Sequence, residues 1–248
     1  MKLQRSLRGR RSRRRPDPGG GAAAGGWRSA RKRMSDNQLG VGSGYRSGYA
    51  SFMVGPNETA LLPAPSDIIV GSLSQARKHK RRFDAVITLE DPACRPANRL
   101  RFTRRPSPAH LVLAFEDVDD DTLGVRVATH EQVAETIAFG RAHNAGSLLV
   151  HCFHGVGRSA AVALAIMADR LGPGAERKAL EQLLAVRPQS TPNIVVVKLA
   201  DDILARNGQL IATVAAWEAE TPGLKEKRAM RLQMVKSSPE LYTWLDRR

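Results

Sequence analysis

The sequence predicts an α/β domain whose central, mostly parallel sheet is flanked by helices. Short apolar runs suited to buried strands alternate along the chain with longer segments of helical periodicity. One such run, residues 147–151, leads through a glycine-containing stretch to residues 160–171, which are apolar almost all round and should form a helix buried in the core. With 248 residues, 42% of them hydrophobic, the chain can bury one good core but hardly two. A single domain with two terminal additions is therefore expected.

The individual elements follow from the same patterns. Strands are expected at residues 68–70, 83–89, 100–102, 110–115 and 147–151. Helices are expected at residues 72–82, 129–143, 160–171, 174–186, 192–206, 210–219, 225–236 and 240–245. Ser72 and Thr129 should cap the first two helices, because a hydroxyl oxygen accepts an unpaired N–H of the first turn. In an α/β sheet of this kind, ligands bind at the carboxyl ends of the strands.

The charge of the chain is concentrated at one end. The formal net charge is +15, but residues 1–52 contain 13 Lys and Arg against 2 Asp, which is +11 and leaves +4 for the remainder. Residues 1–59 have too few apolar groups to offset the cost of ordering, so a disordered Arg- and Gly-rich tail is expected. Residues 60–208 should form the α/β domain and residues 209–248 a helical C-terminal extension.

Several interpretations of the tail stay open. It suits RNA or an acidic membrane surface, and nucleic acid is expected as a partner only through this tail. It is also Arg-rich and nearly free of acids, as organellar transit peptides are. The plainest interpretation is a solvated tail, or a segment upstream of a true start at Met34 or Met53. A secretory signal is not expected, because the apolar region of such a signal is missing.

The stretch between the strand at 147–151 and the helix at 160–171 carries the chemistry. A loop that closes onto a helix start turns its N–H groups inward, and the helix dipole adds positive charge, so the site suits a phosphate dianion. Gly155 and Gly157 allow a tight turn and a close approach, and the guanidinium of Arg158 can hold two phosphoryl oxygens. The same positive environment favours the thiolate of Cys152, the expected nucleophile. The expected phosphate-binding residues are Phe153, His154, Gly155, Val156, Gly157 and Arg158.

Two neighbours complete the expected machinery. Ser159 should donate a hydrogen bond to the Cys152 sulfur and help it leave, and His151 should orient the loop from behind. A lone cysteine at a strand end is usually an inert buried thiol, but His-Cys-x2-Gly-x2-Arg-Ser specifies five residue types in nine positions at a strand-to-helix junction.

These residues resemble the signature loop of the cysteine-dependent protein tyrosine and dual-specificity phosphatases. The wider segment of residues 68–208, with Leu89-Glu-Asp-Pro92, Arg187-Pro188 and Pro192-Asn193, is similar to a compact bacterial branch of that superfamily. The resemblance covers a little over half of the chain.

A carboxylic acid should accompany the thiolate, because cleavage of a phosphoester expels an alkoxide or phenolate that needs a proton. Asp117, Asp119, Asp120 and Asp121 all follow the strand at 110–115 and all qualify by position. In the resembling families the acid follows an apolar strand ahead of the cysteine, which suits Asp117 and Asp120 about equally. Asp117 is preferred because it comes directly after the strand, and Asp120 is second. Gln189, Thr191 and Asn193 are candidates to place the hydrolytic water, although they also suit a loop and a helix cap.

The expected activity is hydrolysis of phosphomonoesters through a phosphocysteine intermediate, without metal or cofactor. The expected partner is a phosphorylated protein or a small phosphomonoester, with phosphotyrosine leading by resemblance. Phe153, His154 and Val156 stand where phosphoinositide-directed relatives carry lysines, which argues against inositol lipids. The alternatives are an RNA 5′-phosphatase of the same chemistry, a catalytically silent phosphate-binding or scaffold protein, and, less favoured, a sulfur transferase.

The cysteines suggest a compartment. Cys94 and Cys152 give no disulfide framework, and a thiolate nucleophile needs reducing surroundings, so a cytoplasmic protein is expected. Cys94 is either a resolving thiol for oxidised Cys152 or, more simply, an indifferent loop cysteine. No apolar run approaches the roughly 20 residues of a membrane helix. The sequence does not indicate the oligomeric state.

Overall fold

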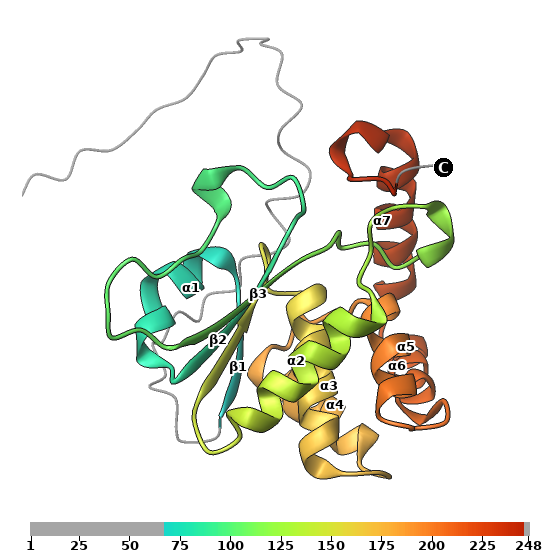
Figure 1. The fold of residues 1–248 in the computed structure, drawn as a ribbon. Helices are drawn as coiled ribbons and strands as arrows, with labels where there is room; N and C mark the ends of the chain where they lie inside the picture. The colour runs from blue at the N-terminus through green and yellow to red at the C-terminus, as the bar shows by residue number, and fades with distance from the viewer. Residues whose placement is uncertain (1–66, 246–248) are drawn as a thin grey trace, which may run out of the picture. The chain divides into compact units, whose positions relative to one another are not determined.

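A four-stranded sheet lies at the centre of the fold (Figure 1). The computed structural model describes residues 67–245, so the predicted disordered tail lies outside the described residues. The strands are β1 (Ile68–Gly71), β2 (Ala85–Glu90), β3 (Ala109–Ala114) and β4 (Leu148–His151), in the order β1-β4-β2-β3. Every neighbouring pair is parallel, which confirms the predicted α/β class. All four carboxyl ends therefore meet at one edge.

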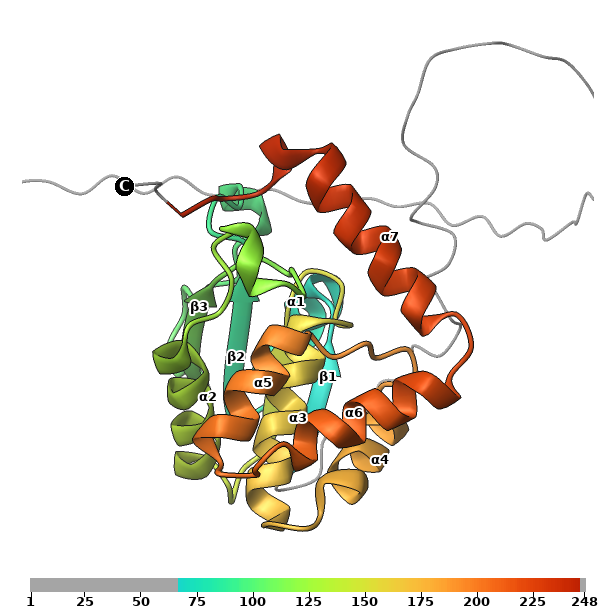
Figure 2. The same cartoon turned by 90° about the vertical axis from the view of Figure 1, so that its right-hand side faces the viewer.

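Seven helices surround the sheet within the described residues. They are α1 (Leu73–His79), α2 (His130–Ala142), α3 (Arg158–Leu171), α4 (Glu176–Val186), α5 (Ile194–Ile203), α6 (Gln209–Glu220) and α7 (Leu224–Ser237). α1 covers one face of the sheet, and α2 to α6 lie on the other (Figures 1 and 2). Ser72 and Thr129 form capping boxes with Gln75 and Gln132 at the starts of α1 and α2, as the sequence predicts.

Alternation along the strands divides the apolar side chains between two cores. Ile87 and Val150 face α3 in the main core, whereas Val86 and Leu149 face α1 in a smaller cluster. In α3, every residue from Arg158 to Ala168 is buried, as expected for a helix that is apolar almost all round. The start of α3 is thereby fixed against the carboxyl end of the sheet.

Two predicted elements are wrong. Residues 100–102 form no strand: Leu100 is buried and Phe102 half-buried in the α1 cluster, with Lys80 over the Phe102 ring. Apolar residues alternate with a polar one here because Leu100 and Phe102 pack in the cluster with α1, and the segment pairs with no strand of the sheet. Residues 240–245 form no α-helix, because the helical turn from Pro239 ends at Leu241 and Trp244 makes an isolated antiparallel bridge with Val125. No helix in residues 67–245 has the length and apolar character needed to cross a membrane.

Candidate active site

All four strand ends contribute to one site. β1 is followed by Ser72 and Leu73, β2 by Asp91, β3 by Phe115 and Asp117, and β4 by Cys152. The loop of residues 152–157 connects β4 to α3 and lies among these ends. The arrangement follows from the parallel sheet, because strands that run the same way deliver their following residues to the same edge.

The carbonyl groups of the loop are held by the surrounding structure. Leu73 N–H donates to the oxygen of Phe153 (3.1 Å), and Thr191 N–H donates to that of Val156 (2.9 Å). The Arg187 guanidinium donates to the two carbonyls between them, those of His154 (3.2 Å) and Gly155 (3.0 Å). The oxygen of Gly157 accepts from Ala161 N (3.0 Å) and Asn193 N (3.3 Å). Because groups outside the loop hold these carbonyls, the N–H groups of the loop can face its inner side, where Gly155 N–H donates to the Cys152 sulfur.

The two loop glycines are required for different reasons. Gly155 has φ of 71°, and a Cβ there would collide with the backbone of Gly71 and Ser72. At Gly157, φ is negative (−95°), and a Cβ would collide with the carboxylate of Asp117. The loop thus passes close to the end of β1 on one side and close to Asp117 on the other.

Cys152 is 1% exposed at the base of the loop. Its sulfur accepts a hydrogen bond from Gly155 N–H (3.2 Å) and lies 3.2 Å from the hydroxyl oxygen of Ser159. A backbone N–H, a hydroxyl group and the N-terminus of α3 therefore lie around the sulfur. The predicted contact between Ser159 and Cys152 is present in the structure.

Arg158 is buried at the first position of α3, with its guanidinium turned toward the ends of β2 and β3. Nη1 donates to the oxygen of Phe115 (2.6 Å), and Nη2 pairs with Asp91 (2.7 Å). Nε lies 4.0 Å from Asp117 and has no hydrogen-bond partner among the described residues. Burial opposes the charge, but Asp117, Cys152 and Asp91 nearby raise the pKa of Arg158 above its ordinary value, so the cation persists.

The structure separates the four candidate acids. Asp117 lies against the loop at Gly157, and its Oδ1 accepts a hydrogen bond from Asn193 (3.1 Å). Asp119 points instead to the start of α5, where it accepts from Ile194 N–H (2.9 Å) and pairs with arginines of α7. Asp120 accepts from the hydroxyl and N–H of Thr122, and these bonds lower its pKa. Asp121 is exposed in the same turn. Of these four aspartates, only Asp117 lies next to both Arg158 and the loop.

Two histidines, one just before the loop and one in it, have pKa values lowered by burial. His151 is buried in β4, where burial lowers its pKa to about 4; Nε2 contacts the Thr88 hydroxyl at 2.8 Å and Nδ1 lies 3.4 Å from the oxygen of Cys152. Burial also lowers the pKa of His154. His151 thus lies behind the loop, as predicted, and connects it to β2 through Thr88.

Asp91 and Arg187 have roles that the sequence pattern alone does not reveal. Both lie in short segments that carry the family resemblance, but only the structure shows that one pairs with Arg158 and the other with the loop carbonyls. Asn193 caps α5 by accepting from Val196 N–H and also holds Asp117. Asn193 is therefore the predicted helix cap and also a partner of Asp117, while its role in placing the hydrolytic water stays a prediction.

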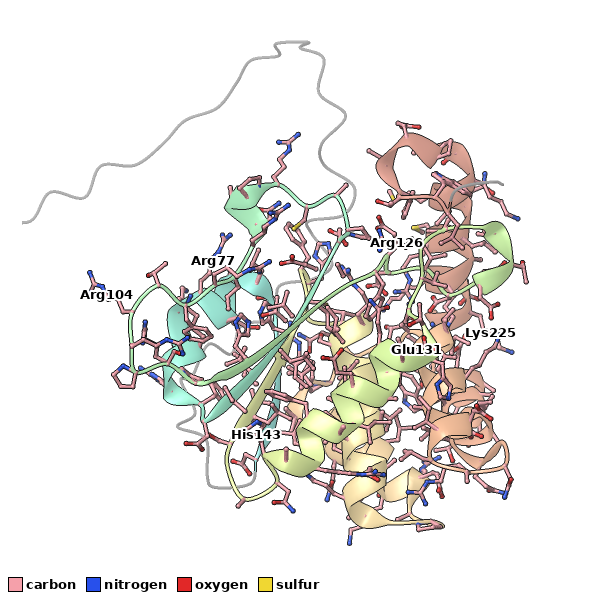
Figure 3. All side chains as sticks on the ribbon, viewed as in Figure 1. Arg77, Arg104, Arg126, Glu131, His143 and Lys225 are labelled. Carbon is pink, nitrogen blue, oxygen red and sulfur yellow. The ribbon has the colours of Figure 1, made fainter. Side chains whose placement is uncertain are left out.

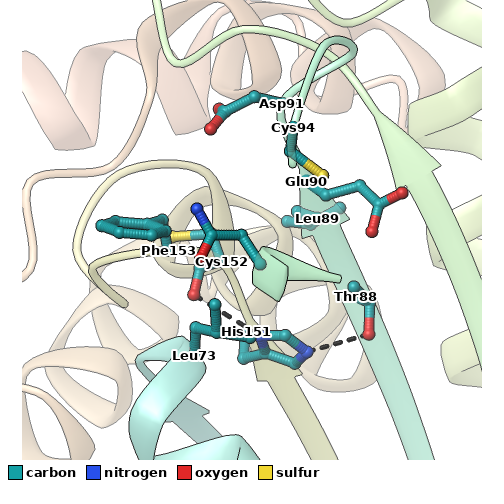
Figure 4. Close-up of a pocket in the computed structure, with 10 residues that line it drawn as sticks. Leu73, Thr88, Leu89, Glu90, Asp91, Cys94, His151, Cys152 and Phe153 are labelled. Atoms are coloured by element: carbon teal, nitrogen blue, oxygen red, sulfur yellow. Dashed lines mark hydrogen bonds between the residues drawn. The ribbon is translucent and has the colours of Figure 1, made fainter. Parts of the chain in front are cut away.

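A pocket beside the loop is lined by residues of three strand ends, including Asp91, Cys94 and Cys152 (Figure 4). Both cysteines of the chain are free thiols and both line this pocket. No group of three or more His, Cys, Asp or Glu suited to a metal ion occurs in residues 67–245.

No family model and no curated protein sequence matches the chain. The chain is similar to dual-specificity phosphatases of known structure. Human DUSP28 is 22% identical over 57% of this chain and 90% of its own (TM-score 0.41). A mouse protein described as a dual specificity phosphatase, crystallised with zinc tungstate, is 23% identical over 64% and 97% (TM-score 0.45).

A third similar structure is the human tyrosine phosphatase-like serine/threonine/tyrosine-interacting protein, which is 19% identical over 56% of this chain and 91% of its own (TM-score 0.43). These proteins carry names from the superfamily that the loop of residues 151–159 resembles in sequence. The bacterial branch stays a prediction.

Proposed function

We propose that the chain hydrolyses phosphomonoesters through a phosphocysteine intermediate at Cys152. The observation that carries this proposal is the position of the Cys152 sulfur, which lies at the base of a loop whose carbonyls are held by surrounding groups and which leads into the N-terminus of α3. The N–H groups on the inner side of such a loop suit the oxygens of a phosphoryl group directly above the sulfur.

Each residue then has a defined step. The Cys152 thiolate attacks phosphorus, a sulfur–phosphorus bond forms, and the bond from phosphorus to the ester oxygen breaks. Asp117 donates its proton to the departing oxygen, and the resulting carboxylate then takes a proton from the water that attacks the phosphocysteine. The free Nε–H of Arg158 and the loop N–H groups stabilise charge on the phosphoryl oxygens, and Ser159 donates to the departing sulfur.

Phosphotyrosine is the substrate class that we propose. Phe153, at the rim of the loop, is 45% exposed and offers an apolar ring surface next to the phosphate site. Because the mechanism requires a reduced thiol, we also propose that the protein works in a reducing compartment such as the cytoplasm.

The test is hydrolysis of p-nitrophenyl phosphate with EDTA present, by the unmodified chain and by Cys152→Ser. The proposal predicts turnover by the first and its loss in the second, while phosphate affinity persists because the loop N–H groups and Arg158 remain. A protein that binds phosphate tightly without any turnover would instead be a silent phosphate-binding protein. Turnover by Cys152→Ser at a tenth of the original kcat or more would exclude the covalent mechanism.

A further inference from the structure

Two stretches that are far apart in the sequence lie together near the site. The first is residues 115–127 after β3, called the acid loop here because it carries Asp117. The second is residues 224–245, called the C-terminal strap, which consists of α7 and the segment after it. Both views show the end of α7 beside the segment that follows β3 (Figures 1 and 2).

The side chain of Asp119 connects the acid loop to α7. Its Oδ2 lies 2.8 Å from Nη2 of Arg231 and 3.0 Å from Nη1 of Arg228. Arg228 also pairs with Glu218 of α6 and donates to the oxygen of Pro192, so it belongs to a wider network. Arg231 has Asp119 as its ion-pair partner and is three-quarters buried, which protects the pair from screening by solvent.

Backbone groups make a second connection, close to the end of the described chain. Thr243 N–H donates to the Glu116 carboxylate (2.9 Å), and the oxygen of Thr243 accepts from Arg126 N–H (2.8 Å). Leu245 N–H donates to the oxygen of Gly124 (2.8 Å). Figure 3 shows Arg126 on this side of the molecule, next to the strap. The strap thus forms a short extra strand-like edge along the acid loop.

Apolar side chains fill the space between these two connections. Val118 and Val125 of the acid loop and Val235 of α7 are buried together, with Tyr242 packed against them. This cluster is separate from both cores of the sheet. Burial of this apolar surface holds the acid loop against α7 independently of the charges.

We propose that the C-terminal strap positions Asp117 for proton transfer, with Arg231 and Thr243 as its positioning residues. Asp117 lies between Glu116, which contacts Thr243, and Asp119, which contacts Arg231, so the strap holds the chain on both sides of the acid. Between Ala114 and Thr129 the chain has only one short helical turn of its own, and a loop of this length needs outside contacts to keep one conformation. This inference rests on the proposed function, in which Asp117 is the acid.

The test uses the full-length chain with Arg231→Met, and Lys227→Met as the matched control, because Lys227 lies on the exposed face of the same helix. Each protein is assayed on phosphotyrosine, whose leaving group needs a proton, and on p-nitrophenyl phosphate, whose leaving group departs readily without one. Arg231→Met should lower kcat/KM for phosphotyrosine about tenfold and leave p-nitrophenyl phosphate within about twofold. Arg231→Lys should restore most of the loss, and Lys227→Met should behave as the unmodified chain.

Equal losses on both esters, or no loss on either, would overturn the proposal. If Arg231→Met does not fold, Thr243→Pro carries the same expectations, because it removes the N–H that holds Glu116 while Tyr242 already has the extended backbone that precedes a proline. Failure of the strap is distinguishable from failure of the proposed function. If only the role of the strap is wrong, Cys152→Ser abolishes turnover but Arg231→Met leaves the ratio of kcat/KM between the two esters unchanged. If the proposed function is wrong, turnover is absent or does not depend on Cys152, and both proposals fall.

Discussion

Replacing Arg187 by Met should loosen the loop of residues 152–157, the proposed phosphate site. The guanidinium donates to the oxygens of His154 and Gly155, and it also contacts Gln75 at 3.3 Å. A hydrogen bond from a charged donor contributes about 1.5–3 kcal/mol, and the lower end applies here because the side chain is only half-buried. The two loop bonds together then contribute about 3 kcal/mol, and if half of this is expressed in the transition state, kcat/KM falls about tenfold.

The measurement is kcat/KM on two esters with different leaving groups. Because Arg187 holds the proposed phosphate-binding loop rather than the proposed acid, both esters should lose activity by the same factor. Arg177→Met is the control, because Arg177 is an exposed residue of α4 that pairs only with surface glutamates in the described structure. Retention of more than half of the activity by Arg187→Met would refute the assigned role of the side chain.

Three further predictions test other parts of the site. Asp117→Asn should lower kcat/KM for phosphotyrosine by ~10²–10⁴ and kcat/KM for p-nitrophenyl phosphate much less, whereas Asp120→Asn should be nearly silent; the reverse result would move the acid to Asp120. Gly155→Ala should lower both activity and phosphate affinity at least tenfold, because its Cβ meets backbone rather than a movable side chain, and wild-type affinity by phosphate titration would contradict this. Burial lowers the pKa of His110 and His151 to about 4 from 6.5, so below about pH 6.5 the unfolded chain binds more protons at these positions than the folded chain. Their contribution to the free energy of unfolding should be complete above pH 6.5 and be lost as the pH falls toward 4. When urea titrations measure the free energy of unfolding at several pH values, its slope against pH should be smaller in His151→Asn. An unchanged slope would count against the buried neutral form.

Local patterns in the sequence predicted most of the fold. Strand runs, helical periodicity and the caps at Ser72 and Thr129 depend on residues close to one another. The mostly parallel sheet was predicted from the alternation of strands with helices, but the order of its strands was not. The elements that were wrong, residues 100–102 and 240–245, bury apolar groups against distant partners that a local pattern cannot identify.

The residues of the candidate site, too, were predictable from the sequence only where they lie close together along the chain. Cys152, Arg158 and Ser159 lie within eight residues and their geometry follows from one strand-to-helix junction, so the sequence alone brings them together. Asp91 and Arg187 reach the same site from other strand and helix ends, and an isolated aspartate or arginine carries no signal of its partner. The contacts of the strap could not be predicted from local sequence patterns, because its bonds to the acid loop join residues more than a hundred positions apart.

The central claim, covalent catalysis by Cys152, is tested most directly by trapping the intermediate. Asp117→Asn should hydrolyse the phosphocysteine slowly, since the base that activates water is lost, so the intermediate should accumulate with p-nitrophenyl phosphate as substrate. After rapid acid quenching, peptide mass spectrometry should locate one phosphoryl group on Cys152, and the same treatment of the Cys152→Ser, Asp117→Asn double variant should give none. A burst of p-nitrophenol with no phosphoryl group on Cys152, or a label on another residue, would contradict the mechanism.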